Sequence, residues 1–277
     1  MTNMQTDLTP ELIYYAQNAL LEGPLWNDED GLLYFVSIDD EMIYRLNEKT
    51  LEIDSYPTDG PVGAAVLNED GMIFSAEKSG IYLIDPETKK RTFFMQPNKD
   101  ERQRYNDGKM DPKGRFLIGT MGYKETLEGE ASLYVIEDGE ARGLISNLTL
   151  SNGMGWSSDG ETFYHIDTPT KKVKKYDYDL ETAEVSNEDV VVEITGDGAP
   201  DGMCVDLDEN IWVAEFGGKR ICKWDSKTGE LLVEIPMPVT NITSCCLGGP
   251  DKDYLYITTG KKDDEPLSGG LFRVKIR

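Results

Sequence analysis

Short apolar segments follow turns rich in Asp, Asn and Gly along the whole chain. Six of these turn-and-strand units have the sequences NDEDGLLYFV, NEDGMIFSA, DPKGRFLIGT, SSDGETFYHID, DLDENIWVAEF and GPDKDYLYITT. The units align on positions that lie 40 to 50 residues apart, namely Gly31, Gly71, Gly114, Gly160, Asn210 and Asp253. No segment shows a long apolar period of 3.6 residues, so the pattern predicts strands rather than helices.

A later strand of each unit alternates apolar and polar residues, the period of a half-exposed strand. These strands are MIYRLN, GIYLID, SLYVIE, KVKKYDYD, RICKWD and GLFRVKI, and turn signals such as NEKT, PETKK and SKTG follow them. Six modules of about four strands predict an all-β fold, a six-bladed β-propeller that forms one domain over residues 1–277. An irregular β-sandwich is the alternative, and the similarity of the six modules argues against it. We expect the strand at 12–20 to close the ring by completing the sixth blade.

The composition of the chain narrows the range of binding partners that we expect. The 277 residues include 39% hydrophobic residues, with a mean hydropathy of −0.47 and a net charge of −24. Such a charge repels phosphate backbones and anionic lipids and attracts cations, so we expect neither nucleic acid nor a membrane as partner. The first residues, MTNMQTDLTP, lack the basic and apolar regions of a signal peptide, and no apolar run approaches the roughly 18 residues of a membrane helix. We therefore expect a cytoplasmic protein.

Histidine and cysteine restrict the possible chemistry. The single histidine, His165, excludes a His-rich zinc site and any catalytic triad that does not use it. We expect His165 to be a buried core residue. The four cysteines lack a CxxC pair and are expected to be buried thiols: Cys204, Cys222, Cys245 and Cys246. A bound metal would then have oxygen ligands, which favours calcium, magnesium or manganese.

Polar residues recur about nine positions before the alignment points, where the innermost strand of each predicted blade begins. The residues there are Glu22, Val62, Asn106 with Asp107, Asn152, Asp201 and Ser244. One Asx-Gly pair would indicate only a turn, but repetition at one phase places these side chains around one channel mouth. Glu22, Asn152 and Asp201 would offer two carboxylates and an amide oxygen to a divalent cation. We expect Asp107 to have a structural role.

Several longer segments are distinctive in combination: EGPLW, RYNDGKMDPKGRFLIGTM, LSNGMGWSSDGETFYHID, PDGMCVDLDENIWVA and TSCCLGG. With them the chain resembles the SMP-30/gluconolactonase/regucalcin-like family over nearly its whole length. The resemblance implies a six-bladed propeller with one divalent metal at the channel mouth and lactonase activity on sugar lactones. It implies metal ligands at Glu22, Asn152 and Asp201, and substrate contacts from Arg104 and Asn106. One position departs from the family: Lys124, followed by Glu125, stands where regucalcin-like members have a substrate-contacting glutamate.

The leading hypothesis is a metal-dependent lactonase that hydrolyses a gluconolactone-like sugar lactone. It would use one divalent ion per chain, calcium first, with manganese, magnesium or zinc as alternatives. Asp201 is the candidate catalytic base because it can contact both the metal and the attacking water. Two other functions stay open at this point: a phosphotriesterase-type hydrolase on the same site, and a non-catalytic calcium-binding regulatory protein. A protein-binding scaffold ranks last.

Overall fold

The computed structural model describes residues 8–16 and 19–277. In these residues the secondary structure consists of 24 β-strands and the short 3-10 helix η1 (Thr168–Thr170). No helix in this part of the chain is long and apolar enough to cross a membrane. The all-β prediction is therefore confirmed.

Four antiparallel sheets of four strands each follow one another along the chain. The first contains β2 (Leu21–Asn27), β3 (Leu32–Ser37), β4 (Met42–Leu46) and β5 (Ile53–Pro57). The second contains β6 (Val62–Leu67), β7 (Ile73–Glu77), β8 (Gly80–Ile84) and β9 (Arg91–Met95). The third contains β10 (Gln103–Met110), β11 (Phe116–Gly122), β12 (Ala131–Glu137) and β13 (Glu140–Leu148). The fourth contains β14 (Ser151–Trp156), β15 (Thr162–Asp167), β16 (Lys172–Tyr178) and β17 (Val185–Glu193).

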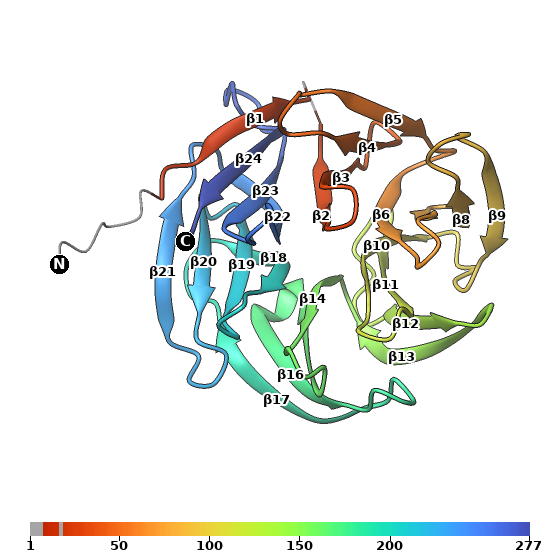
Figure 1. Cartoon of the computed structure of the whole chain (residues 1–277). Helices are drawn as coiled ribbons and strands as arrows, with labels where there is room; N and C mark the ends of the chain where they lie inside the picture. The colour runs from red at the N-terminus through yellow and green to blue at the C-terminus, as the bar shows by residue number, and fades with distance from the viewer. Residues whose placement is uncertain (1–7, 17–18) are drawn as a thin grey trace.

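The remaining strands form one eight-stranded sheet with two four-stranded halves. One half contains β18 (Ala199–Val205), β19 (Ile211–Phe216), β20 (Arg220–Trp224) and β21 (Leu231–Pro236). The other contains β22 (Asn241–Gly248), β23 (Tyr254–Gly260), β24 (Gly270–Lys275) and β1 (Glu11–Tyr15). The halves are joined through the pair Phe216–Asn241 of β19 and β22. Figure 1 shows all these sheets around a common centre, with β2, β6, β10, β14, β18 and β22 nearest to it.

The Asp- and Asn-rich turns have a common cause in side-chain hydrogen bonds. Asp111 Oδ1 accepts hydrogen bonds from the backbone N–H groups of Lys113 (2.9 Å) and Arg115 (2.8 Å). Asp206 does the same for the groups two and four residues later, at 2.9 and 3.0 Å, and Asn68 at 3.1 and 2.8 Å. These Asx turns replace the backbone partners that the chain loses where it reverses. The sequence repeat is therefore a repeat of turn chemistry.

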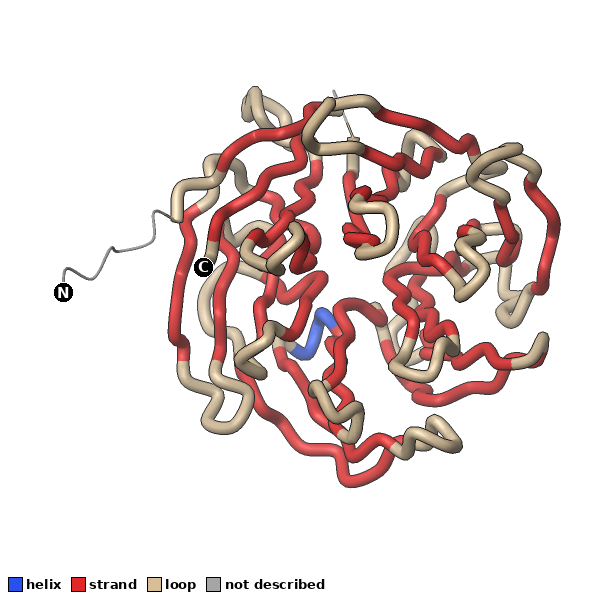
Figure 2. The backbone as a smooth tube through the Cα atoms, in the orientation of Figure 1, coloured by secondary structure: helices blue, strands red, loops and turns tan. Residues whose placement is uncertain are grey.

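Apolar clusters fill the spaces between neighbouring sheets. One joins Val36 of β3 to Val62 of β6, and another joins Leu21 of β2 to Tyr256 of β23, which connects the first and last sheets. At that junction the rings of Trp26 and Tyr256 stack with their centroids 5.5 Å apart. The first strand, β1, pairs antiparallel with β24. The ends of the described chain thus lie in one sheet, and Figure 2 shows the ring that results.

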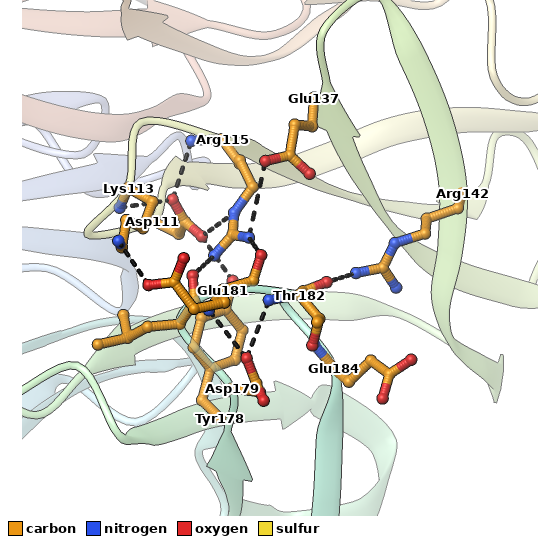
Figure 3. A network of polar contacts seen from close by, with 11 residues as sticks. Asp111, Lys113, Arg115, Glu137, Arg142, Tyr178, Asp179, Glu181, Thr182 and Glu184 are labelled. Carbon is orange, nitrogen blue, oxygen red and sulfur yellow. Dashed lines mark hydrogen bonds and ion pairs between the residues drawn. The ribbon is translucent and has the colours of Figure 1, made fainter.

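A polar network adds to this packing between the third and fourth sheets (Figure 3). Arg115 is 3% exposed and donates through Nε to Asp111 (2.7 Å) and through Nη2 to the carbonyl of Leu180 (2.7 Å). The hydroxyl of Tyr178 donates to the same Asp111 carboxylate at 2.6 Å. A buried charge is stable only when it is paired and hydrogen-bonded, as Arg115 and Asp111 are here.

Candidate functional site

The polar residues predicted from the inner strands line one cavity of about 180 Å³. Its lining includes Glu22 from β2, Arg104 and Asn106 from β10, Asn152 from β14 and Asp201 from β18. Each of these strands is the innermost of its sheet or half-sheet (Figure 1). The structure therefore brings together all five predicted site residues, while their roles stay predictions.

Asn152 and Asp201 are joined directly across the cavity. The Nδ2 group of Asn152 donates hydrogen bonds to Asp201 Oδ1 and to Thr168 Oγ1, the latter at 3.1 Å. The Thr168 hydroxyl donates onward to the carbonyl of Pro200 at 2.8 Å, next to Asp201. Thr168 belongs to η1, the blue segment near the centre of Figure 2. This chain of hydrogen bonds orients the Asn152 amide.

The orientation leaves one oxygen without a donor. Asn152 is 3% exposed, and its Oδ1 is buried with no hydrogen-bond partner among the described residues. A buried polar atom without a partner costs free energy of about 1–3 kcal/mol. The orphaned oxygen lies in the same cavity as two carboxylates, so its natural complement is a cation.

The carboxylates themselves are held in unfavourable surroundings. Burial raises the pKa of Asp201 to about 8, and the charge of Asp107 adds to that rise. Burial, with the charges of Asp201 and Asp107, raises the pKa of Glu22 well above its usual range. Burial also raises the pKa of Asp107. The charge of Arg104 lowers the pKa of Asp201 and Glu22, and that of Lys109 lowers the pKa of Asp107, but burial and mutual repulsion outweigh these effects. A bound divalent cation would offset this excess of negative charge.

Arg104 and Asn106 form a second, donor-rich part of the cavity. Arg104 Nη1 donates to Asn106 Oδ1 (2.9 Å) and to the carbonyl of Tyr105 (2.8 Å). Asn106 Nδ2 donates to the carbonyl of Ser151 at 2.9 Å, so the Asn106 amide is fully oriented. Among the hydrogen bonds of the described residues, Arg104 donates only through Nη1. Its other N–H groups are available to a ligand.

Glycines after the site residues permit the close approach of the inner strands. A Cβ atom on Gly153 would lie 2.6 Å from the carbonyl oxygen of Asp201, and one on Gly202 would lie 2.0 Å from Ser244 Oγ. Both distances are far below ordinary van der Waals contact, so only glycine fits. The glycines of these Asx-Gly pairs therefore keep side-chain bulk out of the contacts between inner strands.

Residues outside the sequence prediction also contribute. Thr168 and six apolar residues lie in the cavity lining. Lys109, three residues after Asn106, donates through Nζ to the carbonyls of Met154 and Met203, both at 3.0 Å. It therefore ties β10 to β14 and β18 across the channel. Apolar lining residues carry no chemical motif, and only their positions next to strand ends could have indicated them.

The position that departs from the family lies apart from the cavity. Lys124 and Glu125 are exposed and absent from the cavity lining as far as the described residues go. They line a separate surface depression with Lys78 and Tyr123. The ammonium groups of Lys78 and Lys124 lie 5.0 and 5.6 Å from the centre of the Tyr123 ring. In this structure neither residue replaces the family glutamate at the cavity.

Asp107 and His165 have the structural character predicted for them. Asp107 Oδ1 accepts a hydrogen bond from the backbone of Gly108 at 2.8 Å. His165 is 1% exposed, and its Nε2 forms a 2.9 Å hydrogen bond with Ser151 Oγ. Burial lowers the pKa of His165 to about 3, so it is neutral at physiological pH. The four cysteines are free and buried, which confirms that prediction.

The residues present fit a divalent metal with oxygen ligands. Within the described residues, no group of three or more His, Cys, Asp or Glu side chains is placed to hold a metal ion. The candidate set has two such side chains, Glu22 and Asp201, and its third member is the amide oxygen of Asn152. The orphaned state of that oxygen and the raised pKa values of the two carboxyl groups both match a hard cation.

Comparisons with known proteins agree with this geometry. The family model described as SMP-30/Gluconolactonase/LRE-like region matches residues 20–261. A regucalcin of Xenopus laevis is 33% identical over 267 residues, which cover 91% of this chain and 89% of the relative. The structure of a calcium-binding protein, regucalcin, from Agrobacterium tumefaciens superposes with a TM-score of 0.90 at 26% identity, covering 98% and 96% of the two chains. A gluconolactonase from Xanthomonas campestris shares the fold, with a TM-score of 0.80 at 19% identity and coverage of 97% and 90%.

Proposed function

Because the chain belongs to the SMP-30/gluconolactonase/LRE-like family, we propose that it is a divalent-cation-dependent lactonase that hydrolyses a gluconolactone-like sugar lactone to its aldonic acid. The observation that carries the proposal is the presence of acceptor and donor groups in one cavity. Its lining contains acceptor oxygens of Glu22, Asn152 and Asp201 together with N–H donors of Arg104. A simple calcium store would need the acceptors but not the donors.

Each residue has a defined part in this proposal. Glu22, Asn152 and Asp201 would hold the cation, which when bound polarises an ester carbonyl and lowers the pKa of water. Asp201 would accept the proton of the attacking water, because its carboxylate could contact both the cation and that water. Its Oδ1 is already the acceptor of the Asn152 amide, so the carboxylate is held in one orientation. Calcium is our first choice of ion, with manganese, magnesium or zinc as alternatives.

Arg104 and Asn106 would bind the substrate. The remaining N–H groups of Arg104 can donate two hydrogen bonds to substrate oxygens, and the guanidinium is held in place by Asn106 and Tyr105. The polar side chains of the cavity would thereby supply a proton acceptor for the attacking water and hydrogen bonds that hold the lactone ring in place. A strained cyclic ester is an undemanding substrate for a carboxylate base beside a cation.

We also propose a fold detail, that the ring has six blades in one domain. Four of them would be the four-stranded sheets, and two would be the halves of the eight-stranded sheet. The single joining pair, Phe216–Asn241, supports this count, because strands of one blade share several consecutive pairs. The pairing of β1 with β24 supports closure of the ring by the N-terminal strand.

The test is the opening of glucono-1,5-lactone above its spontaneous rate. Protein treated with a chelator is assayed alone and after addition of calcium, manganese, magnesium or zinc separately. We expect turnover only with a cation, and its loss in Glu22→Gln but not in the exposed control Glu29→Gln. Tight cation binding without opening of any lactone would overturn the proposal.

A second function would then lead. The Agrobacterium relative is described as a calcium-binding protein, and a non-catalytic calcium-binding regulatory protein would use the same three acceptors. This alternative predicts that a cation raises the free energy of unfolding and that no lactone is hydrolysed, whether or not Arg104 is substituted.

A further inference from the structure

The lining of the candidate cavity combines polar groups with apolar side chains. Six of its residues, named here the apolar rim, have hydrocarbon or thioether side chains: Leu20, Ile38, Met121, Leu150, Ala199 and Phe216. The charged and amide groups described above line the same cavity. A ligand that fills this cavity therefore meets two chemically different surfaces.

The apolar residues come as three neighbouring pairs from different parts of the ring. Ile38 donates its backbone N–H to the carbonyl of Leu20 at 3.0 Å. Met121 and Leu150 form an isolated β-bridge between the third and fourth sheets. Ala199 pairs with Phe216 across β18 and β19. The apolar character is thus spread around the opening and does not belong to one loop.

Most of these side chains are accessible. Phe216 is 40% exposed, and four of the other five are partly exposed, while Ile38 is buried. Exposed apolar side chains gathered around a pocket commonly mark a surface that a ligand covers. Hydroxyl groups placed against them would lose their water without gaining hydrogen bonds, at a cost in binding free energy. A substrate with hydroxyls on every ring carbon would hydrogen-bond to the polar groups of the cavity but would gain no binding free energy from the apolar rim.

We propose that the substrate is a lactone that carries an aliphatic substituent on its ring, held by this apolar rim. The inference rests on the proposed lactonase function and changes its substrate from a polyhydroxylated lactone to an alkyl-substituted one. The ester group faces Asp201 and Arg104, and the substituent packs between the Met121–Leu150 and Ala199–Phe216 pairs. The reaction is unchanged: water adds to the ester carbonyl, the ring C–O bond breaks, and the alcohol oxygen takes the proton.

A chain-length series tests the proposal. Hydrolysis is measured, with the activating cation present, for δ-valerolactone, δ-hexalactone, δ-octalactone and δ-decalactone, which differ only in their alkyl group. Burial of each methylene against the rim should raise kcat/KM by about two- to fourfold until the chain extends beyond the rim. Phe216→Ser should flatten this dependence. The matched control Phe93→Ser removes a phenylalanine that is 55% exposed on β9, and should leave the dependence unchanged.

Binding gives a readout that does not depend on turnover of the series. The corresponding alkyl δ-lactams, which resist hydrolysis, are tested as competitive inhibitors, and their inhibition constants should fall with chain length by the same factor. Rates and inhibition constants that are independent of chain length would overturn the aliphatic substituent and leave the lactonase function standing. If no lactone, glucono-1,5-lactone included, is opened with any cation, the proposed function fails and this inference fails with it.

Discussion

The side-chain amide of Asn152 donates a hydrogen bond to the carboxylate of Asp201, although 49 positions separate the two residues in the chain. The oxygen of the same amide is buried and has no hydrogen-bond partner among the described residues, and Asn152 lines the cavity. Asn152 thus adds a neutral amide oxygen to the two carboxylates of the proposed acceptor set. The arrangement leads to the following predictions.

Cation binding should stabilise the folded protein. A divalent cation at a hundredfold excess over its Kd adds about 2.7 kcal/mol to the free energy of unfolding, which corresponds to a rise in Tm of roughly 5–10 °C. Differential scanning calorimetry with and without calcium measures this rise. Asp201→Asn should abolish it, whereas Glu29→Gln, on an exposed turn, should retain it. A rise of equal size in both variants would contradict the site.

Cation binding should also release protons. Burial raises the pKa of Asp201 to about 8 and moves the pKa of Glu22 in the same direction, so protons compete with the cation for these carboxyl groups at pH 7. The cation must displace them, so its affinity should increase between pH 6 and pH 8. Isothermal titration calorimetry in two buffers of different ionisation enthalpy counts the protons. Release of no protons at pH 7 would show that both carboxylates are already ionised.

Arg104 should contribute to catalysis without supporting the fold. Removal of its donors in Arg104→Met should lower kcat/KM for an accepted lactone by about 10- to 100-fold, the worth of hydrogen bonds from a charged group. Arg102, directly before β10, is a matched control. Its side chain is 52% exposed and forms ion pairs with Asp100 and Glu130. Equal losses in Arg104→Met and Arg102→Met would point to a general effect of charge.

His165 should make the protein less stable in mild acid. Its pKa is about 3 when folded, against about 6.5 for a histidine in an unfolded chain. Between these values the unfolded state binds more protons, so the free energy of unfolding falls as pH falls. From pH 7.5 to 5.5 the histidine should account for a loss of about 1.4 kcal/mol. Urea denaturation at both pH values should show this extra loss in the wild type but not in His165→Gln.

The network around Arg115 should be a major support of the third and fourth sheets. In Arg115→Met the buried Asp111 carboxylate loses its partner, and the free energy of unfolding should fall by about 3–5 kcal/mol. Lys113→Met removes a neighbouring ion pair to Glu181 whose side chains are 47% and 81% exposed, and should cost at most about 1 kcal/mol. Similar losses in both variants would mean that burial of the pair adds nothing.

Much of this arrangement could be predicted because it depends on local chemistry. The turn at Asp111 uses hydrogen bonds to residues two and four positions later, so its sequence predicts its structure directly. The phase of Glu22, Asn152 and Asp201 predicted their convergence for the same reason, since each begins an inner strand. The predicted strand at 12–20 is shorter, with β1 at Glu11–Tyr15, and positions 17 and 18 lie outside the described residues.

Other features depend on contacts that no local pattern encodes. Lys109 donates to carbonyls 45 and 94 positions away, and an ordinary lysine after Asp-Gly does not indicate this. The amide of Asn106 likewise donates to the carbonyl of Ser151 in the next sheet, 45 positions away. The apolar rim also depends on long-range contacts, because Phe216 and Leu150 line the same cavity only through the curvature of the ring.

The pairing of β1 with β24 has a consequence for the order of events during synthesis. A ribosome produces the first strand long before the strand that it pairs with, so the first strand must wait until the last one has emerged. Glu22 and Asp201 likewise come from early and late parts of the chain. A nascent chain that has not reached Asp201 therefore lacks part of the candidate site, and the ring closes later still, once β24 has emerged.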